Sequence, residues 1–376
     1  MKTKVNVFNK THFEVDLEGF SFPPGEEIWI EIETNSMRFR TIRADKRLRV
    51  GRTDNELWKK QNCEETYDFN MVYDAGMLAR SFAYPKVIEA LATPIIKYLP
   101  EGSAGFTNFP ARTGLNLRFF SERRIHEQGK HPVGPKDVFM SHGIGDKEYW
   151  NAEMIKGFSN VLVPGPAWKE KIEKGGYKGR IFVTGYTKLD PLFNGGYKRN
   201  KYSKPYIVWA PTHGYYKTHK GRSSYPECLQ LIKEIPNIYE KKIALHPANK
   251  IRHSRSKDVT LQELLDADVV IADAGSTLYE AWALGKPVIF PDWLCKRDIL
   301  DRFGPDNLEY QIYSKGIGYH AENMKHLVEL IEVALAEGMR EPEKEFMERI
   351  FPTNLRGKAG EASAKALLQI SEEGGE

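Results

Sequence analysis

Histidine, hydroxyl and glycine residues recur just beyond short apolar runs in the last two-thirds of the chain. A histidine can take a proton from an attacking hydroxyl group or donate to a phosphate oxygen, and a serine or threonine hydroxyl can donate to the same anion. A glycine lets the backbone approach a ligand closely. These residue types suit the transfer of a group from a phosphate-containing donor. They occur as SHG (141–143), TGY (184–186), PTHG (211–214), HP (246–247) and DAGST (273–277).

The apolar runs that precede these residues predict the strands of parallel sheets. Amphipathic segments such as AWKEKIEKGG separate them, and strands alternating with helices at this spacing are typical of the α/β fold class. Parallel sheets bind ligands beyond the carboxyl ends of their strands, so the residues that follow the runs should share one crevice. The predicted strands are DVFM (137–140), NVLV (160–163), RIFV (180–183), YIVW (206–209), KIAL (242–245), DVVI (268–271) and PVIF (287–290).

The stretch DVVIADAGSTLYEAWALGKPVIF (268–290) gives the strongest indication of a phosphate site. Gly275 permits a tight turn after the strand, Ser276 is a good N-cap, and residues 278–284 predict a helix. The free N–H groups at a helix start attract a phosphate, to which the hydroxyls of Ser276 and Thr277 could also donate. The alternative is an ordinary capped helix that binds no ligand.

Glu280 lies on this predicted helix, roughly opposite the core-facing stripe of Leu278, Ala281 and Trp282. It comes four residues after Ser276, which is one position too late to close a capping box. Its carboxylate could accept a hydrogen bond from the ribose of a nucleotide. The alternative is a glutamate that faces solvent.

Two histidines are candidates for chemistry at the strand ends. His142 could act as the base for a hydroxyl nucleophile, and Gly143 and Gly145 would let a ligand approach it. His246 could donate to a phosphate oxygen of a donor. Each of the two could instead be a structural histidine. Three other residues that follow predicted strands complete the expected donor-binding set: Gly185, Thr212 and His213.

The length of 376 residues predicts two domains, and a break near 190–205 separates them. This segment, DPLFNGGYKRNKYSKP, combines a Gly-Gly pair, basic residues and prolines, as linkers do. We therefore expect an N-terminal, acceptor-side domain over residues 1–190 and a C-terminal, donor-binding domain over 203–350. Residues 351–376 should contain a final helix.

Composition and motifs exclude several classes of protein. The net charge of +4 is too small for a general polycation, and no window approaches 18 uninterrupted apolar residues. The N-terminus has no apolar stretch of the secretory type, so we expect a cytoplasmic protein. The sequence contains no C-x-x-C pair, no P-loop and no G-x-G-x-x-G, and the D-x-D at 266–268 precedes a strand. We expect neither a bound metal nor a tightly bound cofactor.

A basic stretch, RFRTIRADKRLRVGR (38–52), contains seven basic residues and one acidic residue. Arginines at strand spacing could form one basic face that contacts a polyanionic acceptor, such as nucleic acid, a wall polymer or a membrane surface. A solvated strand face is the alternative. The candidate residues are Arg38, Arg40, Arg43, Arg47, Arg49 and Arg52.

The motifs over residues 137–370 resemble, in their order, those of CDP-glycerol glycerophosphotransferase-like proteins of the teichoic-acid type. The resemblance implies the GT-B fold, with two Rossmann-like domains and the nucleotide-activated donor on the C-terminal one. It implies that His142 is the catalytic base and that His246 and Ser276 contact the donor phosphates. The chain departs from the family pattern at Gly275, at His213 and at IGDK (144–147). The motifs are SHGIGDK, VLVPGPAW, VTGYTKLDPL, WAPTH, LHP, DAGSTLYEAWALGKPVIF and RGKAG.

Two other resemblances keep the donor and the acceptor open. TGYTKLD and GSTLYEAWALGKPVI are also similar to segments of UDP-N-acetylglucosamine 2-epimerases and other GT-B glycosyltransferases. Phage DNA-base glycosyltransferases share the same fold, and the basic stretch would suit DNA as their acceptor. The expected function is the transfer of glycerol phosphate or a sugar, from CDP-glycerol or a UDP-sugar, to an acceptor hydroxyl. The acceptor would be a wall polymer, another glycan or DNA.

Overall fold

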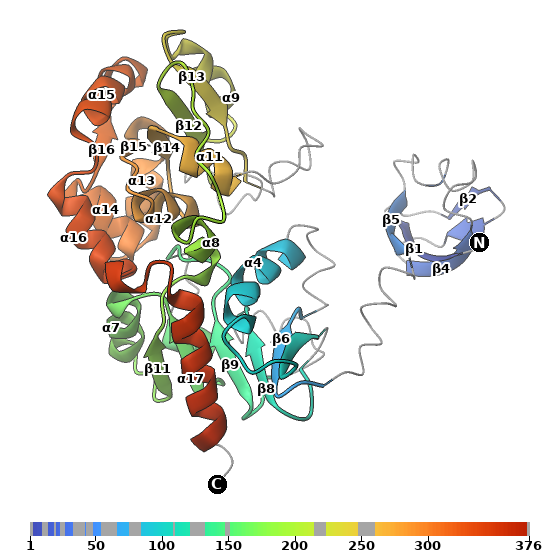
Figure 1. Ribbon diagram of the computed structural model, residues 1–376. Helices are drawn as coiled ribbons and strands as arrows, with labels where there is room; N and C mark the ends of the chain where they lie inside the picture. The colour runs from blue at the N-terminus through green and yellow to red at the C-terminus, as the bar shows by residue number, and fades with distance from the viewer. Residues whose placement is uncertain are drawn as a thin grey trace.

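The computed structural model describes the chain in segments that together contain four β-sheets (Figure 1). Two of the sheets are large and entirely parallel, with six and five strands, and the other two are small and antiparallel. The described residues are 3–9, 14–18, 20–22, 27–32, 42, 48–53, 66–74, 84–107, 110–120, 132–146, 151–213, 223–246 and 260–373.

The described residues between Thr3 and Thr53 form a small antiparallel unit with a core of its own. The three-stranded sheet has the order β4-β1-β5, and a hairpin of β2 and β3 accompanies it. Its buried apolar side chains include Val7, Phe22 and Ile30, and Asn9 donates to the carbonyl of Phe22 at 2.7 Å. The strands are β1 (Thr3–Asn9), β2 (Val15–Leu17), β3 (Phe20–Phe22), β4 (Glu27–Ile32) and β5 (Leu48–Thr53).

The six-stranded sheet has the order β11-β10-β9-β8-β6-β7, and all of its strands are parallel. Three predicted strands, DVFM, NVLV and RIFV, are confirmed with identical bounds. The expected N-terminal domain began at residue 1, whereas this sheet begins at Phe69. The strands are β6 (Phe69–Val72), β7 (Ala104–Thr107), β8 (Leu115–Arg118), β9 (Asp137–Met140), β10 (Asn160–Val163) and β11 (Arg180–Val183).

The direction in which strands are added to this sheet reverses between β6 and β8. Strand β7 pairs with one side of β6, and β8 and the later strands are added on the other side. Such a switch point leaves a crevice at the carboxyl ends of the two strands, where α/β proteins place ligands. The helical segments of this part are α4 (Tyr84–Ile96), α6 (Ala152–Ile155), α7 (Pro166–Lys174), η1 (Thr187–Leu189) and α8 (Asp190–Phe193).

The five-stranded sheet has the order β13-β12-β14-β15-β16, and its switch point lies between β12 and β14. The predicted strands here are confirmed within one or two residues. The shift is largest at β13, an edge strand with alternating charged residues. The strands are β12 (Tyr206–Ala210), β13 (Glu240–Ile243), β14 (Val269–Ala272), β15 (Val288–Pro291) and β16 (Tyr319–Ala321).

Helices cover both faces of this second sheet. One core cluster, which includes Ile207, Ile271 and Leu327, fills one face, and the other face joins the core of the six-stranded sheet. The described helical segments here are α9 (Cys228–Leu231), η3 (Ile232–Glu234), α11 (Thr260–Asp266), α12 (Ser276–Ala283), α13 (Asp292–Arg302), α14 (Leu308–Lys315) and α15 (Met324–Glu337).

The C-terminal segment returns the chain to the six-stranded sheet. It contains α16 (Glu341–Ile350), η4 (Thr353–Leu355) and α17 (Ala359–Glu373), so the expected final helix is present. Helix α16 contacts both α7 and α12, and α17 packs along α4 (Figure 1). The carboxylate of Asp190 accepts from the N–H groups of Ala359 and Gly360, at 3.2 and 2.7 Å, and so fixes the start of α17.

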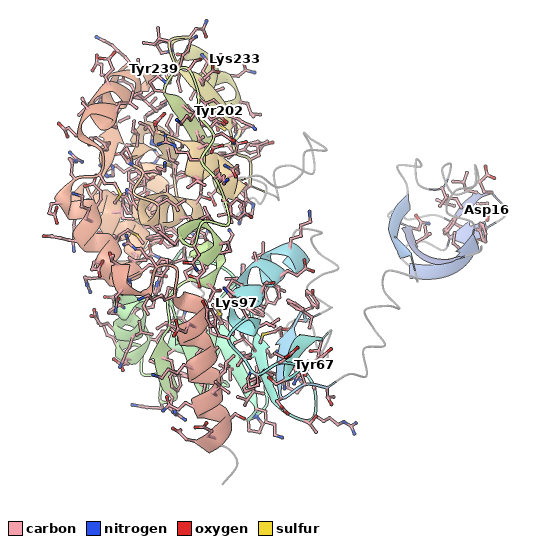
Figure 2. The ribbon with its side chains drawn as sticks, viewed as in Figure 1. Asp16, Tyr67, Lys97, Tyr202, Lys233 and Tyr239 are labelled. Atoms are coloured by element: carbon pink, nitrogen blue, oxygen red, sulfur yellow. The ribbon has the colours of Figure 1, made fainter. Side chains whose placement is uncertain are left out.

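The sequence placed a break near 190–205. Residues 190–193 form helix α8, and residues 194–205 contain no helix or strand. Contacts with the second domain nevertheless hold this segment. The backbone and side chain of Asn200 donate to Asp266 at 2.7 and 2.8 Å. The ring of Tyr202, which is labelled in Figure 2, stacks on that of Tyr206 with centroids 4.2 Å apart. Over the described segments, no helix combines the length and the apolar character needed to cross a membrane.

Candidate active site between the two sheets

The start of helix α12 differs from the expected one by one residue. Gly275 is the N-cap, with φ +84° and ψ −166°, and the helix begins at Ser276. We expected Ser276 to be the cap. The turn after β14 needs a positive φ at that position, which glycine adopts without steric cost, so the serine occupies the first helical position. Ser276 and Thr277 are half-buried at the helix start, where the first N–H groups have no partner within the helix.

His142 lies just beyond β9 and is held by the neighbouring strand β8. The carbonyl of Phe119 accepts from the His142 backbone N–H and also from its Nδ1, both at 3.2 Å. The ring of Phe120 lies on the imidazole, with centroids 5.2 Å apart. Because a carbonyl can only accept, Nδ1 carries the hydrogen, and Nε2 holds the lone pair in the neutral ring. A neutral imidazole in this tautomer can accept a proton at Nε2.

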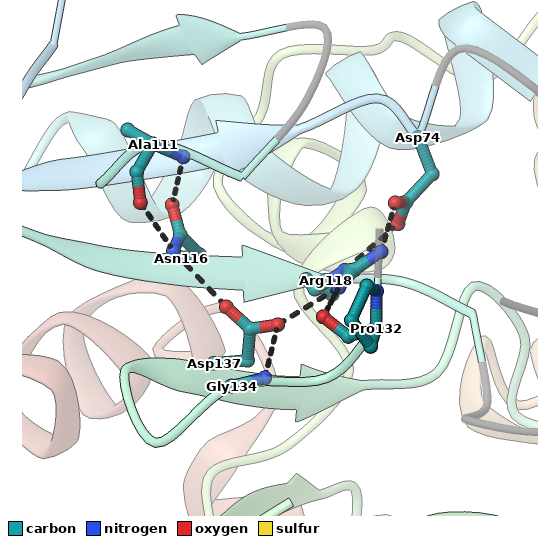
Figure 3. A network of polar contacts seen from close by, with 7 residues as sticks. All are labelled: Asp74, Ala111, Asn116, Arg118, Pro132, Gly134 and Asp137. Atoms are coloured by element: carbon teal, nitrogen blue, oxygen red, sulfur yellow. Dashed lines mark hydrogen bonds and ion pairs between the residues drawn. The ribbon is translucent and has the colours of Figure 1, made fainter. Parts of the chain in front are cut away.

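A buried ionic network lies at the end of β8 (Figure 3). Arg118, the last residue of β8, is fully buried between the carboxylates of Asp74 and Asp137. Asn116 donates to Asp137 at 3.0 Å, and Arg118 donates to it at 2.8 Å. Burial acts to lower the pKa of Arg118, but the two carboxylates outweigh it and raise that pKa. The network ties the ends of β6 and β8 to β9, immediately before Phe119.

The loop after β9 packs directly on the start of α12. Gly145 N–H donates to Ser276 Oγ at 3.3 Å. A Cβ atom at Gly145 would lie 2.7 Å from Gly275 Cα, and one at Gly143 would lie 2.7 Å from Ser276 Oγ. Only glycine fits at these two positions without displacing a neighbour. The structure therefore places the loop that carries His142 against Ser276, a predicted site residue of the other domain.

Asp146, at the end of the same loop, connects the two domains. Its carboxylate accepts from the Leu308 N–H at the start of α14, at 2.9 Å, and pairs with Lys171 of α7. Its carbonyl accepts from Asn307 Nδ2 at 2.7 Å, and its own N–H donates to Glu309 at 2.9 Å. All these atoms are buried or partly buried, so the contact is a fixed part of the interface. The sequence analysis did not single out Asp146.

Glu280 occupies a different environment from the expected one. We expected a side chain off the core-facing stripe, but Glu280 is 2% exposed. Its Oε1 accepts from Lys188 Nζ at 2.8 Å and from the Tyr186 hydroxyl at 3.2 Å. The amphipathic pattern failed because both domains cover α12, which leaves it no solvent-facing side. The pKa of Tyr186 is raised well above its ordinary value, mainly by burial and to a smaller extent by the charge of Glu280. A role of Glu280 toward a ribose stays a prediction.

Asp273 organises the switch point of the second sheet. This buried carboxylate accepts from the N–H groups of Thr212 at 2.8 Å, Ala274 at 2.7 Å and Ser224 at 2.6 Å. Burial raises the pKa of Asp273, and these N–H donors act against that rise. Asp273 thus fixes the loop after β12 relative to the start of α12. An acidic residue directly after an apolar run was the available signal in the sequence.

The two other predicted histidines lie together. The rings of His213 and His246 meet edge to face, with centroids 4.9 Å apart. His213 follows Thr212, which Asp273 holds, so this pair belongs to the same edge of the second sheet as Ser276. The segments that follow the two histidines, 214–222 and 247–259, lie outside the described residues.

Gly185 is not at the group formed by His142 and Ser276. With φ +88°, it packs against the C-terminal segment, where an added Cβ would lie 2.7 Å from Ala359 Cβ and 2.9 Å from Phe351 Cε2. The structure gives it a packing role, because the turn after β11 must pass close to the chain before α17.

The basic stretch lies mainly outside the described residues, which include neither Arg38, Arg40, Arg43 nor Arg47. Arg49 and Arg52 belong to β5, of which only the backbone is described at these positions. The D-x-D lies before β14, as expected, where Asp266 binds Asn200 and Asp268 pairs with Arg199.

Comparison with known proteins identifies the fold. No protein-family model matches the sequence, and no curated protein matches it. A structure of the wall teichoic acid polymerase TagF is similar, with a TM-score of 0.52, 14% identity, and 82% of this chain and 89% of that chain covered. A variant of TagF gives a TM-score of 0.53 at 14% identity, over 81% and 88% of the two chains. The fold is GT-B.

This GT-B chain thus has the two parallel sheets that the sequence resemblance implied. An identity of 14% establishes shared architecture alone. A structure described as a putative UDP-N-acetylglucosamine 2-epimerase from Listeria monocytogenes gives a TM-score of 0.47 at 14% identity, over 82% of this chain and 98% of that chain.

Proposed function

We propose that this protein is a transferase that moves a glycerol-phosphate or glycosyl group from a nucleotide-diphosphate donor to an acceptor hydroxyl. One observation carries the proposal. The loop bearing His142 lies against the start of α12, at the carboxyl ends of two parallel sheets that face each other. A base and an anion-binding helix start, one from each domain, are therefore adjacent. The GT-B architecture shared with TagF supports the same proposal.

His142 takes the proton from the acceptor. The Phe119 carbonyl holds the ring with the hydrogen on Nδ1, so Nε2 receives the proton and Nδ1–H···O stabilises the imidazolium that forms. With CDP-glycerol, the acceptor oxygen attacks the phosphorus next to glycerol, the P–O bond to the cytidylate breaks, and CMP leaves. With a UDP-sugar, the oxygen attacks the anomeric carbon and UDP leaves.

The donor phosphates occupy the helix start. The first N–H groups of α12 and the hydroxyls of Ser276 and Thr277 donate to them, and their fixed positions stabilise the charge that develops on the leaving group. His246 donates from the edge of β13. Ser276 Oγ already accepts from Gly145 N–H, so a phosphate at this hydroxyl shares it with the loop that carries His142. Donor binding and the placement of the base are thereby linked.

Nucleotide binding tests the donor part of the proposal. In a thermal-shift panel of CMP, CDP, UMP, UDP and GDP, a nucleotide at 100 times its Kd should add about 2.7 kcal/mol to the folded state. Preference for cytidine nucleotides indicates glycerol-phosphate transfer, and preference for uridine nucleotides indicates sugar transfer. No stabilisation by any of the five would contradict the proposal. Conversion of a UDP-sugar without an acceptor would indicate an epimerase instead.

Serine variants locate the phosphate. Ser276→Ala should weaken nucleotide binding about tenfold, because a hydrogen bond to a charged group contributes about 1.5 to 3 kcal/mol. Ser314→Ala is the matched control, since Ser314 is an exposed serine in helix α14. Equal affinity of the two variants would place the phosphate elsewhere.

A further inference from the structure

Asp146 is the residue through which the loop bearing His142 is joined to the second domain. Its side chain and backbone contact Lys171, Asn307, Leu308 and Glu309, and the last three lie across the interface. The carboxylate sits at the first N–H of α14, where a negative charge is favoured by the helix dipole. Asp146 is 0% exposed, and its partner Lys171 is largely buried.

We infer that Asp146 is a positioning residue for the catalytic base, which sets His142 by anchoring its loop on the second domain. The inference rests on the proposed function, in which His142 is that base. The loop has two anchors. The Phe119 carbonyl holds His142 itself, within the first domain, and Asp146 holds the other end on α14 of the second domain. Between them, Gly143 and Gly145 lie on Ser276 and make no side-chain contacts of their own.

The geometry explains why the second anchor matters. Gly143 and Gly145 flank the buried Ile144, and glycine restricts the backbone least of all residues, so the loop depends on its anchors for a single conformation. The contacts to Asn307, Leu308 and Glu309 tie the far end of the loop to the second domain, and the contact to Lys171 lies within the first domain. Loss of the Asp146 carboxylate should therefore loosen the loop that carries His142.

The chain offers a matched control on the same helix. Lys171 and Lys174 both extend from α7 toward the segment before α14. Lys171 pairs with the buried Asp146, whereas Lys174 pairs with Asp306 at 2.6 Å, with both side chains about 70% exposed. An exposed pair of this kind contributes little to stability. Lys174→Met therefore removes a contact from the same helix α7, made to the segment before α14, without touching the loop.

The state of His142 is the direct readout. We would label the ten histidines with ¹⁵N, record long-range ¹H–¹⁵N spectra, and assign His142 by its absence in His142→Ala. The wild type should show one neutral form with the hydrogen on Nδ1. In Asp146→Ala this signal should shift or split, while Lys174→Met should leave it unchanged. Release of CMP from CDP-glycerol, or of UDP from UDP-N-acetylglucosamine, should fall about 100-fold in Asp146→Ala, the usual effect of a misplacement of about 1 Å.

The outcomes separate this inference from the proposed function. An unchanged His142 signal in Asp146→Ala overturns the inference, whatever the activity. Should that variant fail to fold, Asp146→Asn and Lys171→Met decide, and wild-type spectra for both overturn it. The proposed function fails on a different result, namely wild-type product release by His142→Ala, which leaves the spectral comparison intact.

Discussion

Replacing Gly145 by alanine should destabilise the folded protein, because the loop after β9 packs closely on the start of α12. The added Cβ would lie 2.7 Å from Gly275 Cα and 2.8 Å from Ser276 N, and both are backbone atoms at the fixed start of a helix. A carbon that close cannot be accommodated by rotating a side chain. Overpacking of this kind costs about 1 to 3 kcal/mol, and the lost Gly145–Ser276 hydrogen bond adds about 1 kcal/mol. We expect unfolding free energy to fall by about 2 to 4 kcal/mol.

Urea unfolding followed by tryptophan fluorescence measures this change. Two further variants give the controls. Gly143→Ala should cost about 1 kcal/mol or less, because its Cβ meets only the Ser276 hydroxyl, which can rotate. Gly304→Ala should change stability by less than about 0.5 kcal/mol, because its Cβ would point into open space. If Gly145→Ala unfolds at the same urea concentration as Gly304→Ala, the close docking of the loop on α12 is wrong.

Three further predictions concern buried charges. Asp273→Ala should destabilise the protein by about 3 kcal/mol or more in urea unfolding, since three buried N–H groups lose their acceptor. Lys188→Met should cost about 3 kcal/mol, because it leaves Glu280 buried without its cation, and adding Glu280→Gln should restore most of that loss in the same assay. Burial raises the pKa of Asp190 from 3.8 to about 6, so the folded state binds this proton more tightly than the unfolded chain. Its contribution to stability should therefore decrease as pH rises from about 4 to about 6, by at most about 3 kcal/mol, and Asp190→Asn should remove this slope from stability measured against pH.

The strands that the sequence predicted well are uninterrupted apolar runs. For NVLV and RIFV the predicted and observed bounds agree, because polar and glycine residues flank these β-branched runs and mark where each strand begins and ends. The strands β6 and β8 were missed because buried polar residues interrupt them. Asn70, Asn116 and Arg118 lie inside these strands. They are buried because their side chains form hydrogen bonds with neighbouring groups, although they are polar. A pattern of apolar residues cannot reveal a polar core.

In the candidate site, too, local features could be predicted and contacts between distant residues could not. The turn and helix start at Gly275 and Ser276 could be predicted, because capping is a local property of a few residues. The burial of Glu280 and the contacts of Asp146 could not be predicted from the sequence. Their partners lie on the other domain, 92 residues away for Lys188 and 162 for Leu308, and no local spacing signals such a pair.

A comparison of wild type and His142→Ala tests the central claim most directly. Each protein is titrated with the nucleotide that the thermal-shift panel selects, and product release is then measured at saturating donor with an acceptor present. We predict the same nucleotide affinity within about twofold and a fall in turnover of about 100-fold or more, because general-base catalysis contributes about 10²- to 10⁴-fold. Turnover that stays at the wild-type level, with the nucleotide still bound, would contradict the assignment of His142 as the base.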